Sequence, residues 1–205
     1  MLAWSLVAFE RSALTDSVVI VTGRSDVGLV RRLVFRLRLK KVGAVVPGGA
    51  RRADSVRSGL ALLPGRGYVA IHDAARPLLT ARMIDDGFRI CRGRGPAAYA
   101  APLCDTVKRA KRGRIFSTVP RDELCAAQTP QFFPLPLVRR GHEEALRRGL
   151  APTDDCAAVE LVGSRPLVIP SLLPNFKVTT PADMKLAEAV LRSGPRRHVA
   201  ITGKR

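Results

Sequence analysis

The sequence predicts an α/β fold built on a mostly parallel sheet. Short apolar runs alternate with amphipathic stretches along the chain, a pattern typical of strands joined by crossover helices. The chain has 205 residues, of which 46% are hydrophobic and 25% charged, so it can bury a core without disulfides or structural metals. No apolar run approaches the roughly 18 residues that a membrane-spanning helix needs. We therefore expect a soluble protein of one domain or slightly more.

Five short apolar segments have the length of strands. Most are rich in β-branched residues, which favour strands over helices. They are Ser17–Val21, Val42–Val46, Tyr68–Ile71, Ala97–Pro102 and Leu167–Ile169. Helical periodicity between them is the reason for expecting a parallel arrangement.

The predicted helices carry their own start signals, which are side chains that cap free N–H groups or a proline at the first position. In chain order these are Asp54 or Ser55 before Val56–Leu63, Thr80 before Arg82–Cys91, Thr153 before Asp154–Val162, and Thr180 with Pro181 before Ala182–Leu191. The basic cluster Arg31–Lys41 fits the solvated face of a further helix that leads into a strand.

The beginning of the sequence is unusual. Residues Leu2–Phe9 form an amphipathic helix pattern with no cap and no strand before it, whereas parallel α/β domains commonly open with a strand and a phosphate-facing loop. The same residues lack the basic start and the small cleavage residues of a signal peptide. We expect a chain that begins in the middle of a fold.

One region breaks the alternation of strands and helices. Residues Asp105–Phe133 are polar, strand-like on both sides of Gly113, and without helical periodicity. This pattern predicts a β-hairpin arm that projects from a domain spanning residues 1–195. A basic tail, residues 196–205, follows the domain.

The charge of the chain is strongly positive, with 35 Lys and Arg against 17 Asp and Glu and a formal net charge of +18. A basic surface can bind nucleic acid by releasing counterions from phosphates. However, the basic residues are spread along the whole chain, aromatic residues make up only 5%, and no nucleic-acid motif is present. We expect neither nucleic acid nor a membrane as a partner.

The cysteines and histidines are scattered. Four cysteines without a C-x-x-C pair and three separated histidines suggest neither a zinc site nor a disulfide framework. Free thiols fit a reducing compartment, so we expect a cytoplasmic protein.

The clearest chemical motif is His72-Asp73-Ala74-Ala75-Arg76-Pro77, directly after the strand Tyr68–Ile71. Asp73 would lie at the carboxyl end of a strand, where open α/β sheets bind ligands. A carboxylate and a guanidinium three residues apart suit a magnesium-bound polyphosphate. An internal ion pair between Asp73 and Arg76 explains the motif equally well.

Two weaker segments accompany this motif. Gly48 and Gly49 stand between a strand and a helix, where they would let the backbone approach a ligand, although a plain turn explains them as well. Lys177 alternates with Phe176 and Val178. If those two neighbours pack inward, Lys177 is merely solvated; if it lines the cleft, it is a point charge for a phosphate.

Taken together, these segments closely resemble the 2-C-methyl-D-erythritol 4-phosphate cytidylyltransferases. The matching blocks follow one another in order up to about Leu191. They are Gly48-Gly49, Ala53–Val56, His72–Pro77, Asp105–Lys108, Thr118–Arg121, Gln128–Phe133, Thr153–Asp155 and Asn175–Thr179. The resemblance implies a Rossmann-like nucleotidyltransferase fold with helices on both faces of the sheet. It also implies that the 105–133 arm interlocks two subunits of a homodimer.

The resemblance also implies roles for individual residues. Lys177 and Arg121 would hold methylerythritol phosphate as the catalytic pair, with Arg121 coming from the partner's arm and Thr106 assisting. Asp73 would be associated with Mg²⁺. Residues on the substrate-binding surface would be Arg76, Gly48, Gly49, Ser55, Thr129 and Thr153. Thr153 is explained more simply as part of a helix start.

The implied reaction is in-line attack of the acceptor phosphate on the α-phosphorus of CTP, with release of pyrophosphate and 4-diphosphocytidyl-2-C-methyl-D-erythritol. Two alternatives stay open. One is a pentitol-phosphate cytidylyltransferase, which shares much of this sequence pattern. The other is a catalytically inactive, truncated dimer that binds nucleotide weakly.

The sequence departs from the family at its start. The family opens with a strand and a glycine-rich loop of the L-A-A-G-x-G-x-R type, followed by a lysine, and these cradle the triphosphate. Val21–Ser25 cannot replace them, because this segment matches a later strand of the family. Either the start is assigned too far downstream or this is a truncated copy. We expect residues 1–205 alone to transfer almost no cytidylyl group and the upstream loop to restore the reaction.

Overall fold

The strands of the body form two separate sheets in the computed structural model, which describes residues 1–171 and 173–193. The first sheet pairs β1 (Val18–Thr22) with β2 (Val42–Pro47) in parallel. The second sheet has the order β3-β7-β4-β8, formed by Tyr68–Ile71, Cys125–Pro134, Ala97–Pro102 and Leu167–Pro170. Each of the five predicted strands is present, within one residue of its expected bounds.

The second sheet is mixed, because β7 runs antiparallel to both of its neighbours, β3 and β4. β4 and β8 are parallel, as expected. The chain enters β7 directly from the arm, without a crossover helix, and a direct return of this kind gives antiparallel pairing. The prediction that residues 105–133 form one projecting arm is therefore wrong at its end, since Gln128–Phe133 are buried in the central sheet.

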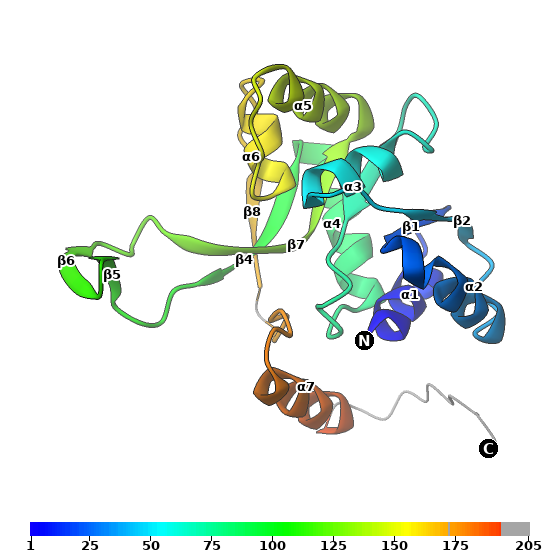
Figure 1. The fold of residues 1–205 in the computed structure, drawn as a ribbon, viewed down its shortest axis with the longest axis horizontal. Helices are drawn as coiled ribbons and strands as arrows, with labels where there is room; N and C mark the ends of the chain where they lie inside the picture. Colours follow the sequence, from blue (N-terminus) through cyan, green and yellow to red (C-terminus); the bar gives the residue numbers. More distant parts are fainter. Residues whose placement is uncertain (172, 194–205) are drawn as a thin grey trace.

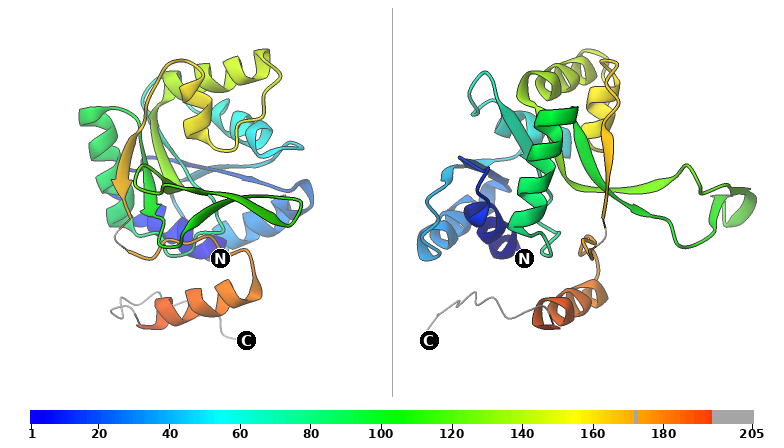
Figure 2. Two further views of the ribbon diagram at one scale, coloured as in Figure 1. Left: turned by 90° about the vertical axis from the view of Figure 1, so that its left-hand side faces the viewer. Right: turned by 180° about the vertical axis from the view of Figure 1, so that it is seen from behind.

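Helices cover both faces of the second sheet, which confirms the predicted α/β architecture (Figures 1 and 2). Phe132 and Phe133 of β7 are both fully buried, and as neighbours in a strand they point to opposite faces. Phe132 packs against α4 (Ala81–Arg94), while Phe133 packs with residues of α3 (Arg52–Leu60) and α5 (Leu135–Arg147).

Three of the four helices with predicted start signals begin within one residue of their predicted starts, and the fourth begins earlier. Thr80 caps α4, and its Oγ1 accepts a hydrogen bond from the Met83 N–H. α3 begins earlier than predicted, because Asp54 is its third residue and accepts from the backbone of Arg51 instead of preceding the helix. α6 (Asp155–Glu160) is capped by Asp154, not Thr153, with Asp154 Oδ1 2.8 Å from the Ala157 nitrogen.

The remaining elements complete the body. The predicted first helix is present as α1 (Leu2–Arg11), which packs against α4. A short 3-10 turn, η1 (Arg24–Asp26), leads into α2 (Val27–Arg36) beside β2. α7 (Pro181–Ser193) lies at the opposite end of the molecule from α5 (Figure 1). The predicted basic tail, residues 196–205, lies outside the described residues.

The predicted hairpin is present and projects away from the body (Figure 1). It pairs β5 (Val107–Lys111) with β6 (Arg114–Val119) across a turn in which Arg112 and Gly113 both have positive φ, of 50° and 75°. No residue between Cys104 and Ala127 is buried, and we call this segment the arm. A two-stranded hairpin without a covered face is marginally stable alone.

A cavity of about 580 Å³ lies between the two sheets. It is lined by β1 on one side and β3 on the other, two strands that belong to separate sheets, and by apolar residues of α1 and α3. Arg52, Ser55 and Asp73 also line it, so the cavity reaches the end of β3 where the predicted site lies. Within the described ranges, no helix is long and apolar enough to cross a membrane.

Candidate active site

Asp73 is the centre of the site. It stands two residues after the last residue of β3, so it lies at the carboxyl end of that strand, as predicted. Its Oδ1 is 3.3 Å from Arg52 Nε and its Oδ2 is 3.2 Å from Lys177 Nζ. Burial alone would raise the pKa of the Asp73 carboxyl, but the two cations outweigh this and lower it. Asp73 is therefore an anion held between two cations.

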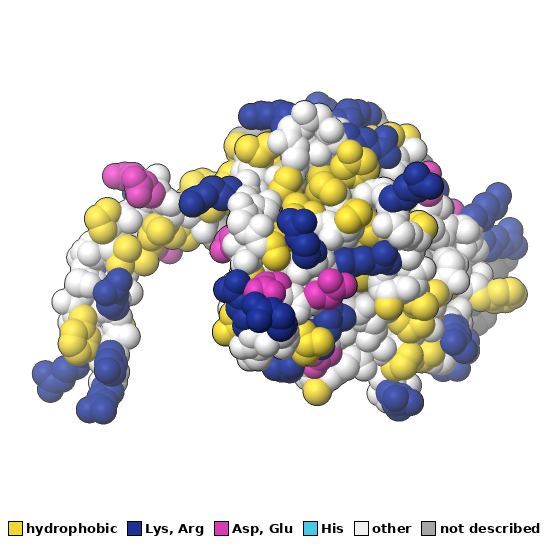
Figure 3. All heavy atoms as spheres, turned by 90° about the horizontal axis from the view of Figure 1, so that it is seen from above, with side chains coloured by type: hydrophobic (Ala, Val, Ile, Leu, Met, Phe, Trp, Pro, Cys, Tyr) yellow, Lys and Arg dark blue, Asp and Glu magenta, His cyan; other side chains and the backbone are white. Residues whose placement is uncertain are grey.

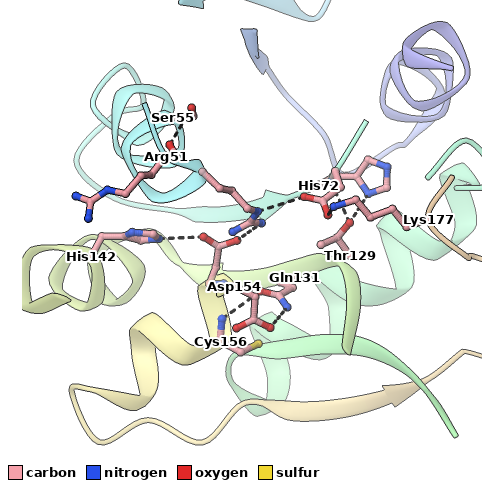
Figure 4. A network of polar contacts seen from close by, with 12 residues as sticks. Arg51, Ser55, His72, Thr129, Gln131, His142, Asp154, Cys156 and Lys177 are labelled. Carbon is pink, nitrogen blue, oxygen red and sulfur yellow. Dashed lines mark hydrogen bonds and ion pairs between the residues drawn. The ribbon is translucent and has the colours of Figure 1, made fainter. Parts of the chain in front are cut away.

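The backbone beside Asp73 is fixed by β7. The Asp73 N–H donates to Thr129 Oγ1 at 3.0 Å, and the Thr129 hydroxyl lies 3.2 Å from His72 Nδ1 (Figure 4). His72 Nε2 is 3.3 Å from the carbonyl oxygen of Arg76, which can only accept, so the proton resides on Nε2 and Nδ1 accepts from Thr129. Burial lowers the pKa of His72 to about 4, so the ring is neutral at neutral pH.

Arg76 does not pair with Asp73, which removes the local ion pair as an explanation of the motif. Arg76 is buried, and its Nη1 donates instead to the Asn175 carbonyl at 2.8 Å. Asn175 is buried as well, and its side-chain nitrogen donates to the Thr129 carbonyl at 2.9 Å. Arg76 therefore joins the loop after β3 to the segment that carries Lys177.

The segment around Lys177 satisfies both possibilities raised by the sequence. Val178 packs inward, and its N–H donates to the Ala75 carbonyl at 2.8 Å. Lys177 lies on the other side of the backbone, with 46% of its side chain exposed, and reaches Asp73. Hence Lys177 is anchored by its neighbours and still presents its ammonium group to the site.

The two glycines allow a close approach of the loop to α3. A Cβ at Gly48 would lie 2.5 Å from Ser55 Oγ, and one at Gly49 would lie 2.3 Å from Asp54 Cβ. The Gly49 N–H donates to Ser55 Oγ at 3.1 Å. The loop thus requires glycine for packing at both positions, and Ser55 holds it in place.

Three predicted site residues lie away from Asp73. Thr106 and Arg121 are exposed on the arm, where the Arg121 guanidinium donates to the carbonyl of Cys104. Thr153 is exposed next to the cap residue Asp154. Among the contacts of the described residues, none joins these three side chains to Asp73 or Lys177.

Sequence reasoning missed Arg52 and the buried residues behind it. Arg52 Nη2 lies 2.7 Å from Asp155 Oδ2, and Asp155 Oδ1 lies 2.9 Å from His142 Nε2. Gln131 joins the same network from β7 (Figure 4). Asp155 and Gln131 both fall inside the matching blocks, so a signal is present in the sequence, but helix capping is a sufficient local explanation of the acidic pair at the start of α6.

The donor set around Asp73 suits a metal ion only together with a ligand. In the described part of the chain, no group of three or more His, Cys, Asp or Glu side chains is placed to hold a metal. Mg²⁺ is commonly held by one or two carboxylates together with substrate phosphates and water. The single carboxylate of Asp73 fits this mode. The four cysteines are free thiols, in agreement with the sequence.

Comparison with known proteins agrees with this arrangement. A family model described as 2-C-methyl-D-erythritol 4-phosphate cytidylyltransferase matches residues 1–193. The enzyme of that name from Pelotomaculum thermopropionicum is 40% identical over 189 residues, covering 91% of this chain and 79% of that protein. The one from Halalkalibacterium halodurans is 36% identical over 197 residues, covering 96% and 86%.

A solved structure gives the same result at the level of the fold. The crystal structure of a 4-diphosphocytidyl-2C-methyl-D-erythritol synthase superposes with a TM-score of 0.81 at 32% identity, covering 93% of this chain and 89% of that one. The Rossmann-like fold and the resemblance stated from the sequence are confirmed. The chain belongs to the 2-C-methyl-D-erythritol 4-phosphate cytidylyltransferase family.

Proposed function

We propose that this chain transfers the cytidylyl group of CTP to 2-C-methyl-D-erythritol 4-phosphate. The observation that carries the proposal is the ionised Asp73 at the carboxyl end of β3, flanked by Arg52 and Lys177. Membership of the family supplies the two substrates. A site of one anion and two cations suits phosphoryl chemistry, in which the protein mainly positions and neutralises charge.

In the proposed reaction, an oxygen of the acceptor phosphate attacks the α-phosphorus of CTP. A new P–O bond forms, the bond from the α-phosphorus to the bridging oxygen of the β-phosphate breaks, and pyrophosphate leaves with that electron pair. Lys177 leaves Asp73 to hold the acceptor phosphate. The part of the site that faces the nucleotide is shaped mostly by backbone held in place. The residues that hold it are Arg76, Gly48, Gly49, Ser55 and Thr129. Thr153 stays a predicted substrate-binding residue.

Mg²⁺ is proposed as the metal ion, held by Asp73 together with the phosphates of CTP. When bound, it would neutralise charge on the phosphates. The protein contributes a carboxylate whose orientation is already set, because the Asp73 backbone is fixed by Thr129 and its side chain by Arg52.

We also propose that the arm joins two chains into a homodimer. The arm exposes Ile115 and Phe116 at 68% each, together with Leu124. Figure 3 shows hydrophobic side chains along the projecting arm. Exposed apolar side chains gathered on a projecting hairpin favour a protein partner. In such a dimer, Arg121 and Thr106 of one chain would complete the site of the other, which accounts for their distance from Asp73 within one chain. A cytoplasmic location and no nucleic-acid or membrane partner complete the proposal.

The test is pyrophosphate release from CTP with methylerythritol phosphate and Mg²⁺. Because the resemblance assigns the triphosphate to a glycine-rich loop, the 205-residue chain is assayed beside a longer chain that begins with such a loop. We expect turnover in the longer chain, abolished by a chelator, and weaker turnover with a pentitol phosphate. If neither chain releases pyrophosphate with methylerythritol phosphate, the proposal fails; faster turnover with the pentitol phosphate would reassign the acceptor.

A further inference from the structure

The two cations on Asp73 are held in different ways. Lys177 is 46% exposed and, among the residues that the structure describes, forms one ion pair, to Asp73. The Arg52 side chain is 33% exposed and bridges two carboxylates from different elements, Asp73 after β3 and Asp155 in α6. A planar guanidinium can bridge in this manner, whereas a lysine ammonium is a point charge on a flexible stem.

The second carboxylate, Asp155, is a fixed anchor. Its side chain is fully buried, and it accepts from His142 Nε2 at 2.9 Å and from Arg52 Nη2 at 2.7 Å. Its backbone N–H donates to Gln131 Oε1 at 3.0 Å, which ties the start of α6 to β7. A buried carboxylate is costly without a paired cation, so Asp155 keeps Arg52 in place.

Arg52 stays protonated in this position. Burial lowers the pKa of the guanidinium, but the attraction and hydrogen bonds from Asp155 and Asp73 outweigh this and raise it. Arg51, its neighbour in sequence, differs in exposure and in its partner. The Arg51 side chain is 55% exposed, and its ion pair is with Asp54, three residues further along the chain. Figure 4 shows Arg51 on the far side of α3 from Lys177.

We infer that Arg52 is a positioning residue, which locks Oδ1 of Asp73 to the buried Asp155 so that Oδ2 alone is exchanged between Lys177 and a phosphate-bound metal ion. The inference rests on the proposed function, which gives Asp73 its metal. Exchange at Oδ2 costs little, because the Lys177 pair is exposed and has no second anchor. Arg52 would hold the carboxylate in one orientation throughout.

The probe is Mn²⁺, whose binding to the 205-residue protein is measured by electron paramagnetic resonance in the presence of CTP. Arg52→Gln should weaken Mn²⁺ binding at least 10-fold, and Arg51→Gln should leave it within twofold of wild type. Arg52→Lys should recover thermal stability, because it keeps a cation near Asp155, but not Mn²⁺ binding, because it cannot bridge both carboxylates.

Arg52→Gln alone leaves the buried Asp155 carboxylate without its cation and can unfold the protein. A double variant, Arg52→Gln with Asp155→Asn, avoids this, because it removes the buried charge together with its partner. It should fold and still bind Mn²⁺ at least 10-fold more weakly. The inference is overturned if a folded Arg52→Gln variant or the folded double variant binds Mn²⁺ as tightly as the wild type. It is also overturned if Arg52→Lys recovers both thermal stability and Mn²⁺ binding. If wild type binds Mn²⁺ with CTP but no chain transfers the cytidylyl group, only the proposed reaction fails. If neither the wild-type 205-residue protein nor the longer chain with the glycine-rich loop binds Mn²⁺ in the presence of CTP, both the inference and the proposed function fail.

Discussion

The site at the end of β3 and the arm are built in opposite ways. Around Asp73, hydrogen bonds join residues from five separate parts of the chain, and two of these residues, Thr129 and Asp155, are buried. In the arm, two neighbouring strands pair only with each other and no residue is buried. The contacts around Asp73 thus lie within one chain, whereas the arm leaves its surface uncovered. The charges around Asp73 can therefore be changed by mutation without altering the surface of the arm.

The most severe test is Asp73→Asn in the longer chain. We expect turnover to fall about 10²- to 10³-fold, as for the loss of one preorganised electrostatic group. The melting temperature should change by only a few degrees, because partly exposed ion pairs contribute little to stability. Pyrophosphate release and thermal melting of the same sample measure both. Full activity in this variant would remove the metal assignment.

The second test mixes two inactive variants of the longer chain, Arg121→Ala and Lys177→Ala. If the arm of one chain completes the site of the other, a random mixture of subunits contains heterodimers with one intact site. We expect up to about a quarter of wild-type activity to return, because half of the dimers are mixed and each carries one working site of two. A mixture that stays inactive after subunit exchange would show that each site is built from one chain.

The third test compares two exposed phenylalanines. Phe116 lies on the arm at 68% exposure and Phe35 on α2 at 86%. Phe116→Asp should raise the dissociation constant of the dimer at least 10-fold, because it places a charge in an apolar contact. Phe35→Asp should leave it unchanged. Sedimentation over a concentration series measures both, and equal effects would contradict an interface confined to the arm.

The smallest expected effect concerns acid stability. The pKa of His72 is about 4 in the folded protein, against an ordinary value of 6.5, so between these values the unfolded chain binds more protons. The free energy of unfolding should fall as the pH is lowered from 6.5 to 4, by about 2 kcal/mol from this ring alone. His72→Gln should flatten that part of the curve in urea titrations. An unchanged slope would show that the ring is already protonated in the fold.

Much of the fold could be predicted from the sequence because its signals are local. Strand lengths depend on runs of apolar residues, and the start of α4 depends on one threonine, Thr80. The buried half of β7 was misassigned, because its polar residues Gln128, Thr129 and Gln131 look solvated in sequence. They are buried because each meets a polar partner from a distant segment.

The site was predicted only in part for the same reason. The turn after β3 identified Asp73. The alternation around Val178 left two possible positions for Lys177, one in solvent and one lining the cleft. Nothing local distinguishes Arg52 from Arg51, since both stand at the start of α3 and only the distant Asp155 selects one of them. Periodicity and capping rules describe neighbours in the sequence, so they do not predict an ion pair between residues this far apart along the chain.

Those sequence separations also set an order of events during synthesis. The strands of the arm pair residues between 3 and 12 positions apart, so the hairpin can close soon after it leaves the ribosome. The pair between Lys177 and Asp73 spans 104 residues and the one between Arg52 and Asp155 spans 103. In the proposed dimer, the hairpin of a nascent chain is therefore available well before the ion pairs of its site have formed, and two such chains can meet at their arms while both are still inactive.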